Sequence, residues 1–138
     1  RILLRKIIIE NAVDYAIANV SVEIIEKINI LNASILAMNL AIEKLKTKPE
    51  FIIVDGNKFK SKNKIPYKCI VKGDSKYMSI AAASILAKTS RDHYMIDLSK
   101  EYPHYHWDVN KGYPTKKHKK IILEKGITKY HRKTFKLN

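Results

Sequence analysis

Two aspartates, Asp55 and Asp74, stand just after short apolar segments of the kind found in buried strands. Asp55 directly follows FIIV and Asp74 comes soon after CIV, and ligands of open α/β sheets gather beyond the carboxyl ends of strands. Paired carboxylates are hard oxygen ligands that suit Mg²⁺ or Mn²⁺, and two such ions about 4 Å apart can stabilise both oxygens of a phosphodiester displacement. Aspartate is also common in turns and helix caps, so a structural role for both residues stays an alternative.

The helices that would frame these aspartates follow from apolar periodicity and capping residues. Helical spacing predicts five helices, at residues 1–11, 21–30, 32–46, 76–100 and 115–126. Ser21 and Thr115 are suitable N-caps, and Gly126 is a C-terminal stop. The longest helix, at residues 76–100, begins two residues after Asp74.

The strands are fewer than the helices. Alternating or continuous apolar residues predict three strands, at residues 14–22, 51–56 and 67–73. Helices and strands in this order indicate an α/β protein with a thin sheet. An aromatic-rich segment, residues 101–114, predicts a loop between the last two helices.

The charge of the chain is concentrated in its second half. Residues 1–55 carry seven basic and seven acidic side chains, whereas residues 56–138 carry twenty basic and six acidic ones, which gives the whole net charge of +14. Such asymmetry indicates a polyanionic partner, nucleic acid above all, for the second half. A lysine-rich composition from codon bias is the alternative.

The sequence also predicts where the protein works. It contains no run of 18 or more uncharged apolar residues and no signal peptide, so we expect no membrane association. The single cysteine, Cys69, excludes a disulfide framework and a cysteine-rich zinc site, which favours the cytoplasm. We expect a monomer.

Five segments share their motifs and order with one known family. FIIVDGNKF contains a V-D-G-N motif, and IVKGDSKYMSIAAASILAKTSRD follows a K-G-D-x-K-x-x-S-I-A-A-A-S-I-x-A-K-x-x-R-D block. The other three segments are INILNASILAMNLAIEKL, YPHYHWDVNKGYPT and HRKTF. In order and spacing, nearly the whole chain resembles bacterial ribonuclease HII.

This resemblance implies a fold and an activity. The fold would be α/β and ribonuclease H-like, with three layers, a central mixed sheet flanked by helices, and a C-terminal helical segment. One domain would span residues 1–138, with a substrate-binding loop and a basic segment at residues 101–138. The activity would be a metal-dependent endoribonuclease that acts on RNA–DNA hybrids and on single ribonucleotides in duplex DNA. It would cleave on the 5′ side of the ribonucleotide and leave 5′-phosphate and 3′-OH ends.

The resemblance also assigns roles to individual residues. The family holds two divalent ions, Mn²⁺ or Mg²⁺, with four carboxylates, of which Asp55 matches the third and Asp74 the fourth. Both would be catalytic metal ligands. Tyr113 matches the tyrosine that stacks near the ribonucleotide and senses its 2′-OH, and packing on its own loop is the alternative role.

Several lysines could bind substrate phosphates. The candidates around the two aspartates and Tyr113 are Lys72, Lys76, Lys88 and Lys111. A basic ridge would add salt-sensitive affinity for the phosphate backbone. Its members are Lys111, Lys116, Lys117, Lys119 and Lys120.

Two departures from the family pattern bear on activity. The chain begins at Arg1 and contains no D-E-x-G-R-G motif, which in the family carries the first two carboxylates on the first strand. We therefore expect an N-terminally incomplete chain that lacks the first strands and is weak or inactive alone. Pro114 replaces a glycine and would stiffen the loop of Tyr113. The alternative function is a non-catalytic, basic nucleic-acid-binding remnant of the fold.

The remaining aromatic and imidazole side chains receive structural roles. His104, His106 and His118 lack a metal-ligand spacing, so we expect them on loop and helix surfaces. Trp107 is expected to anchor the aromatic loop to the core.

Overall fold

The computed structural model describes residues 1–134 and comprises two compact units, residues 1–87 and residues 88–138. Phe135, which closes the HRKTF segment, and the end of the basic segment lie outside the described residues. The helices are α1 (Ile2–Asn11), α2 (Val22–Lys44), α3 (Met78–Glu101), α4 (Trp107–Asn110) and α5 (Lys116–Lys125). Two short 3₁₀ helices are η1 (Gly73–Ser75) and η2 (Pro103–Tyr105).

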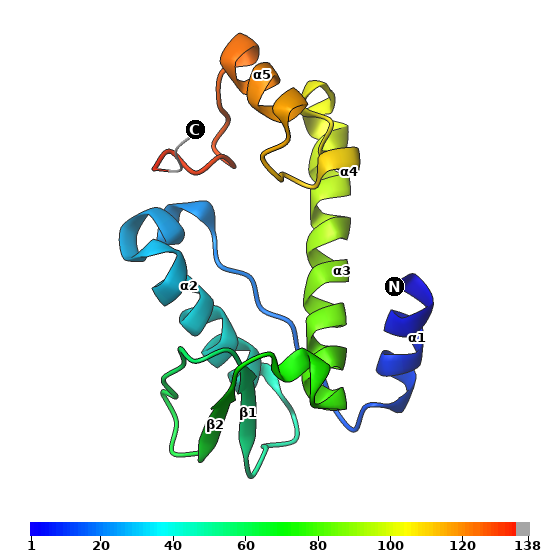
Figure 1. Ribbon diagram of the computed structural model, residues 1–138, viewed down its shortest axis with the longest axis vertical. Coiled ribbons are helices and arrows are strands. Elements are labelled where there is room, and N and C mark those ends of the chain that lie inside the picture. The colour runs from blue at the N-terminus through cyan, green and yellow to red at the C-terminus, as the bar shows by residue number, and fades with distance from the viewer. Residues whose placement is uncertain (135–138) are drawn as a thin grey trace. The chain divides into compact units, whose positions relative to one another are not determined.

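The sheet of the first unit is a parallel pair, β1 (Ile52–Asp55) and β2 (Tyr67–Ile70), which lie side by side in Figure 1. Asp55 is in register with Ile70, so both strands end at the same edge. Among the described residues the sheet consists of this parallel pair alone, so the mixed character that the resemblance implies is not seen there. Two predicted strands are therefore confirmed, and the carboxyl ends of both point to one edge, as the interpretation of Asp55 and Asp74 requires.

The third predicted strand, at residues 14–22, is wrong. This segment has no regular secondary structure before α2 begins. Its polar groups bond to the end of α2 and the loop that follows: Asp14 accepts bonds from the backbone N–H groups of Lys46 and Thr47, and Lys44 donates to the carbonyl of Ile17. Alternating residues form a strand only when a neighbouring strand offers its backbone groups, and this segment finds other partners.

Helix α2 consists of two helical segments, as predicted, which meet at a kink. Asn29 has φ 70° and ψ 168°, outside helical values, and its side chain accepts a bond from the backbone N–H of Asn32. Ser21 caps the first segment by accepting from the N–H of Ile24. The buried Asn39 binds the loop after β1, because it donates to the carbonyl of Lys60 and accepts from the N–H of Lys62.

By length and composition alone, α2 could cross a membrane. This is weak evidence, because core helices of soluble proteins pass the same test. The polar contacts of Asn39 show that α2 packs within the first unit.

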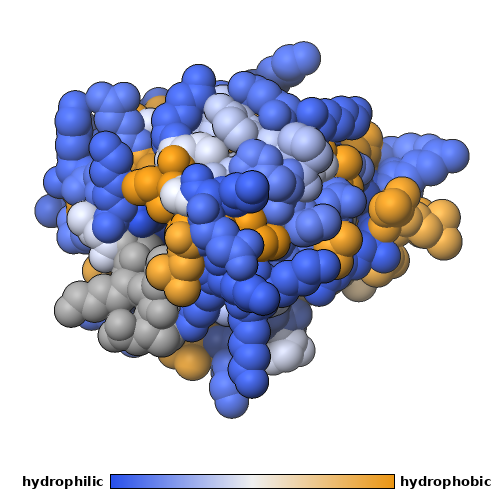
Figure 2. All heavy atoms as spheres, turned by 90° about the horizontal axis from the view of Figure 1, so that it is seen from above, coloured by the Kyte–Doolittle hydropathy of each residue, from blue (hydrophilic) through white to orange (hydrophobic). Residues whose placement is uncertain are grey.

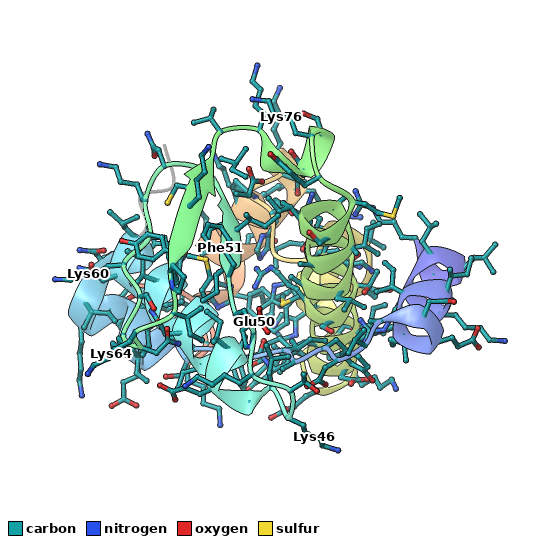
Figure 3. All side chains as sticks on the ribbon, turned by 90° about the horizontal axis from the view of Figure 1, so that it is seen from below. Lys46, Glu50, Phe51, Lys60, Lys64 and Lys76 are labelled. Carbon is teal, nitrogen blue, oxygen red and sulfur yellow. The ribbon has the colours of Figure 1, made fainter. Side chains whose placement is uncertain are left out.

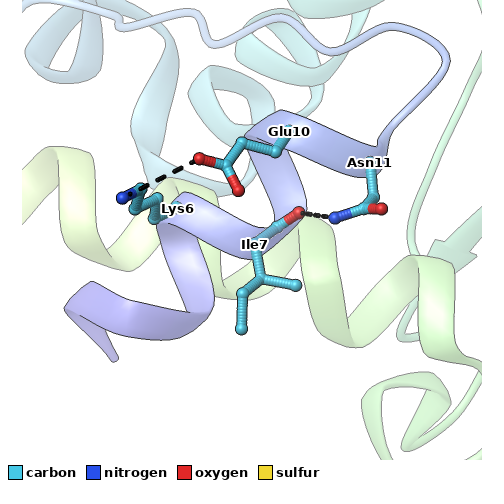
Figure 4. A network of polar contacts seen from close by, with 4 residues as sticks. All are labelled: Lys6, Ile7, Glu10 and Asn11. Atoms are coloured by element: carbon cyan, nitrogen blue, oxygen red, sulfur yellow. Dashed lines mark hydrogen bonds and ion pairs between the residues drawn. The ribbon is translucent and has the colours of Figure 1, made fainter.

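Helix α1 is an exposed element of the first unit. Lys6 and Glu10 form an ion pair across one turn, 3.9 Å between nitrogen and oxygen, and Asn11 donates to the carbonyl of Ile7 (Figure 4). Arg5 donates to the carbonyl of Leu86 near the middle of α3. No residue of α1 is fully buried, so polar contacts such as that of Arg5 help to attach it.

The core of the second unit is aromatic. Trp107 and Tyr105 are each 2% exposed and stack with ring centroids 5.0 Å apart. Three aliphatic residues complete this cluster: Met95, Leu98 and Ile122. The prediction that Trp107 anchors the aromatic loop is confirmed.

Candidate functional site

Asp55 ends β1 with an exposed side chain. Its Oδ1 accepts a hydrogen bond from the backbone N–H of Gly73, with 2.9 Å between nitrogen and oxygen. A carboxylate offers about four lone-pair sites, so one hydrogen bond leaves capacity for a cation. The bond also fixes the carboxylate against the turn that carries Asp74.

Asp74 lies in η1, the 3₁₀ turn that follows β2. Lys72 starts this turn in the left-handed conformation, φ 55°, and the carbonyl of Gly73 accepts the N–H of Tyr77, where α3 begins. Asp74 is exposed, and among residues 1–134 no hydrogen bond ties its carboxylate to a helix end. The capping alternative for Asp74 therefore finds no support in the described residues.

Gly73 allows the turn to approach the strand end closely. A Cβ at this position would stand 2.6 Å from Cδ1 of Ile80 and 3.6 Å from Cα of Asp55. Ile80 is itself buried. A side chain at residue 73 would therefore force the Ile80 side chain to shift, whereas its contact with Asp55 would be an ordinary one.

The two aspartates offer the right chemistry for a hard divalent ion but few ligands. Carboxylate oxygens are the preferred protein ligands of Mg²⁺ and Mn²⁺. Within residues 1–134, however, no group of three or more His, Cys, Asp or Glu side chains gathers to hold a metal. Asp55 and Asp74 each offer carboxylate oxygens of the type that such an ion prefers, and waters or substrate phosphates would have to supply its other ligands.

The lysines around this turn are exposed. Lys72 and Lys76 flank Asp74 in the sequence, and Lys76 reaches outward in Figure 3, as do Lys60 and Lys64 from the loop between β1 and β2. Exposed ammonium groups are accessible to a phosphate backbone. Lys72 and Lys76 remain candidates for substrate binding.

Tyr113 and Lys111 belong to the second unit. Tyr113 is 64% exposed, whereas its backbone N–H donates to the carbonyl of Asn110 and its carbonyl accepts from the N–H of Thr115. Lys111 is half-buried and donates to the carbonyl of Asp108, so part of its role is structural. Lys88, at the start of this unit, is exposed.

The basic ridge falls mainly on α5. Thr115 caps this helix by accepting the N–H of His118, as predicted, and Gly126 follows its last residue at φ 78°. The exposed members of the ridge on this helix are Lys116, Lys117 and Lys120.

Hydrophilic side chains cover most of the surface visible in Figure 2, with separate apolar patches between them.

Sequence analysis missed one residue of the second unit. His118 was expected on a surface, but its side chain is only 4% exposed. Its Nε2 accepts a hydrogen bond from the indole N–H of Trp107, and its Nδ1 contacts the carbonyl oxygen of Tyr113. The signal was available, since His118 follows the N-cap Thr115 by three residues and occupies the apolar face of a basic helix.

Comparison with a solved structure establishes the fold. The crystal structure of the ribonuclease H2 from Pyrococcus horikoshii OT3 matches 96% of this chain and 70% of its own, with a TM-score of 0.82 and 22% sequence identity. The chain thus has the α/β fold of ribonuclease H2. The two parallel strands, η1 and the helices after them are part of that fold.

Comparison with known sequences establishes the family. The family model described as Ribonuclease HII matches residues 1–138. Proteins named Ribonuclease HII from Christiangramia forsetii and Parabacteroides distasonis are each 58% identical over 137 residues, which is 99% of this chain and 69% of each relative. The relative from Phocaeicola vulgatus is 56% identical, and the chain covers 68% of it. The chain belongs to the ribonuclease HII family, whose members are endoribonucleases of the ribonuclease H type 2 class.

Proposed function

We propose that this protein is a divalent-metal-dependent endoribonuclease. Its substrates are the RNA strand of RNA–DNA hybrids and single ribonucleotides embedded in duplex DNA. It cleaves on the 5′ side of the ribonucleotide: the oxygen of water bonds to phosphorus, and the 3′ oxygen of the preceding nucleotide leaves and takes up a proton. The products carry 5′-phosphate and 3′-OH ends. We also propose that the protein is cytoplasmic and monomeric.

The observation that carries this proposal is the pairing of Asp55 with the Asp74 turn. The hydrogen bond from Gly73 to Asp55 holds the end of β1 against η1, and Asp74 follows Gly73 directly. Both carboxylates are exposed, which a nucleic-acid substrate requires.

The proposal gives each of these residues a part in the reaction. Bound Mn²⁺ or Mg²⁺ would supply charge stabilisation to the phosphodiester in the transition state. Asp55 and Asp74 would hold the ions, and Lys72 and Lys76 would neutralise phosphates beside them. Tyr113 would stack on the ribonucleotide and contact its 2′-OH, the group that separates RNA from DNA.

The test is to identify the cleavage products that the natural protein forms from a defined duplex. An end-labelled DNA duplex with one ribonucleotide is incubated with Mn²⁺ or Mg²⁺, and an all-DNA duplex of the same sequence is the control. We expect one cut, 5′ to the ribonucleotide, with a ligatable 3′-OH, and none in the control or in chelator. Cleavage of the all-DNA duplex, or a 2′,3′-cyclic phosphate product, would contradict the proposal.

Two observations favour the alternative, a basic protein that binds nucleic acid without cleaving it. The described residues offer Asp55 and Asp74 without a third clustered ligand, and the net charge is +14. The same assay separates the two functions: the alternative predicts salt-sensitive binding of the duplex with no cut in either metal.

A further inference from the structure

The backbone of Tyr113 is held firmly although its side chain is exposed. Its N–H donates to the carbonyl of Asn110 at 2.9 Å, and its carbonyl accepts from the N–H of Thr115 at 2.8 Å. The Asn110 side chain also accepts the N–H of Gly112 and donates to the carbonyl of Tyr105. The loop therefore presents the exposed ring of Tyr113 from a fixed backbone.

His118 adds a third contact to this backbone from inside the second unit. Its Nδ1 lies 3.1 Å from the carbonyl oxygen of Tyr113, and its Nε2 lies 3.2 Å from the indole nitrogen of Trp107. An indole nitrogen can only donate, so Nε2 must be the acceptor. In a neutral imidazole the proton then sits on Nδ1, which donates to the Tyr113 carbonyl.

Trp107 is in turn fixed by the aromatic core. Its ring is 2% exposed and stacks on Tyr105, whose hydroxyl donates to the carbonyl of Gly126 at 2.7 Å. The indole N–H therefore has one available direction. It sets the tautomer and the orientation of His118, and hence the direction of the bond to Tyr113.

We propose that His118 is a positioning residue for substrate recognition: it links the aromatic core at Trp107 to the backbone of Tyr113 and so fixes where the exposed tyrosine ring stands. This inference rests on the proposed role of Tyr113. Preorganisation of this kind raises the rate, because the ring is in place before the substrate arrives. His118 itself contacts no substrate.

Two substitutions separate the two bonds of His118. In His118→Asn, the side-chain amide nitrogen can replace Nδ1 and keep the donor to Tyr113, but no acceptor faces Trp107. In His118→Gln, the amide oxygen can replace Nε2 and keep the acceptor for Trp107, but the donor to Tyr113 is removed. Both variants carry a side-chain amide, and they differ in which hydrogen-bond partner of His118 they retain, Tyr113 or Trp107.

The first measurement is cleavage at a single ribonucleotide in duplex DNA. We expect His118→Gln to lower kcat/KM by up to about tenfold, the factor that one net hydrogen bond is worth, and His118→Asn to retain most of it. In the Tyr113→Ala background, His118→Gln should cause no further loss, because it acts through the tyrosine. Equal losses in both variants, or a full additional loss in that background, would overturn the inference.

The second measurement needs no activity. Trp107 is the only tryptophan of the chain, so its fluorescence reports on the indole N–H. The emission should shift in His118→Asn and stay unchanged in His118→Gln. Nitrogen-15 NMR of the wild type should show the proton on Nδ1 of His118, and a proton on Nε2 would refute the link.

Failure of the proposed function gives a different result. If Tyr113→Ala cleaves as the wild type does, the role of Tyr113 is wrong, whatever the tautomer of His118. If Tyr113→Ala is impaired and His118→Gln is not, only the positioning role of His118 fails.

Discussion

The carboxylate of Asp55 accepts the backbone N–H of Gly73, and this bond joins the end of β1 to the turn that carries Asp74. The parallel register of the two strands brings their ends to one edge, and the bond holds one of the two carboxylates in a fixed place. Asp55 is therefore both a structural acceptor and a candidate metal ligand. Substitutions can separate these two roles.

Gly73→Ala should destabilise the first unit by about 1–3 kcal/mol, the usual cost of an extra methyl in a packed site. The new Cβ would meet Cδ1 of Ile80 at 2.6 Å. Ile80→Val removes that methyl group, so the double variant should recover part of the loss. Chemical denaturation measures the free energy of unfolding. If Gly73→Ala is as stable as the wild type, the close contact between residue 73 and Ile80 does not affect the free energy of unfolding.

Tyr113→Ala should weaken cleavage at a single ribonucleotide by about 1–3 kcal/mol, the range for stacking of one base on an aromatic ring. The melting temperature should not change, because the ring is 64% exposed. Tyr113→Phe keeps the ring and removes the hydroxyl, so it isolates the contact with the 2′-OH. Steady-state kinetics on the same duplex decide, and unchanged kinetics in Tyr113→Ala would return this residue to a structural role.

His131 should make the protein less stable in mild acid. Burial, and then the nearby His118, lower the pKa of His131 from its ordinary value of 6.5. The unfolded chain therefore takes up a proton before the folded one does, and stability falls as pH decreases from about 6.5 through the lowered pKa. Above that window the contribution is constant.

The matched control is His131→Asn. Nδ1 of His131 accepts the backbone N–H of Thr128 at 2.9 Å, and the amide oxygen of asparagine can replace it without titrating. Denaturation of both proteins between pH 7.5 and 5 should show a smaller fall in the free energy of unfolding for the variant. Parallel pH profiles would contradict the assignment.

Helix α5 should supply part of the affinity for nucleic acid. Substitution of Lys116, Lys117 and Lys120 by glutamine should flatten the plot of log affinity against log salt, by about 0.9 for each phosphate that the helix no longer neutralises. Lys6 and Lys27, which pair with Glu10 and Glu23, provide the control substitutions. Binding titrations at several salt concentrations measure the slope, and an equal slope in the α5 variant would place the binding surface elsewhere.

Local signals in the sequence predicted much of this fold. Ser21 and Thr115 cap helices because their hydroxyls accept N–H groups three residues on, a rule that needs no tertiary information. The apolar runs before Asp55 and Asp74 predicted β1 and β2, because strands of parallel sheets have that composition, although Val54 alone is buried in these two strands. The placement of Asp55 at a strand end followed from the same pattern.

The features that the sequence did not predict depend on partners far along the chain. Residues 14–22 alternate like a strand, but Asp14 bonds to Lys46 and Thr47, and no ladder forms. The burial of His118 depends on Trp107, eleven residues earlier. The bond partners of Asp14 cannot be identified from local periodicity, whereas the apolar face of α5 already indicated that His118 is buried.

The most direct test of the proposed metal-dependent reaction is Asp55→Asn, compared with Asp55→Ala. Asparagine can still accept the N–H of Gly73 through its side-chain oxygen but carries no charge to hold an ion. We expect Asp55→Asn to keep the wild-type melting temperature and affinity for a hybrid duplex. Asp55→Ala should be less stable, because the bond to Gly73 is also absent.

The deciding measurement is cleavage by Asp55→Asn of duplex DNA with one ribonucleotide, in saturating Mn²⁺. A carboxylate that holds an ion stabilises charge in the transition state, so the single-turnover rate should fall by at least about a hundredfold while binding persists. A rate within a few-fold of the wild type would show that Asp55 serves only the bond to Gly73 and holds no catalytic ion.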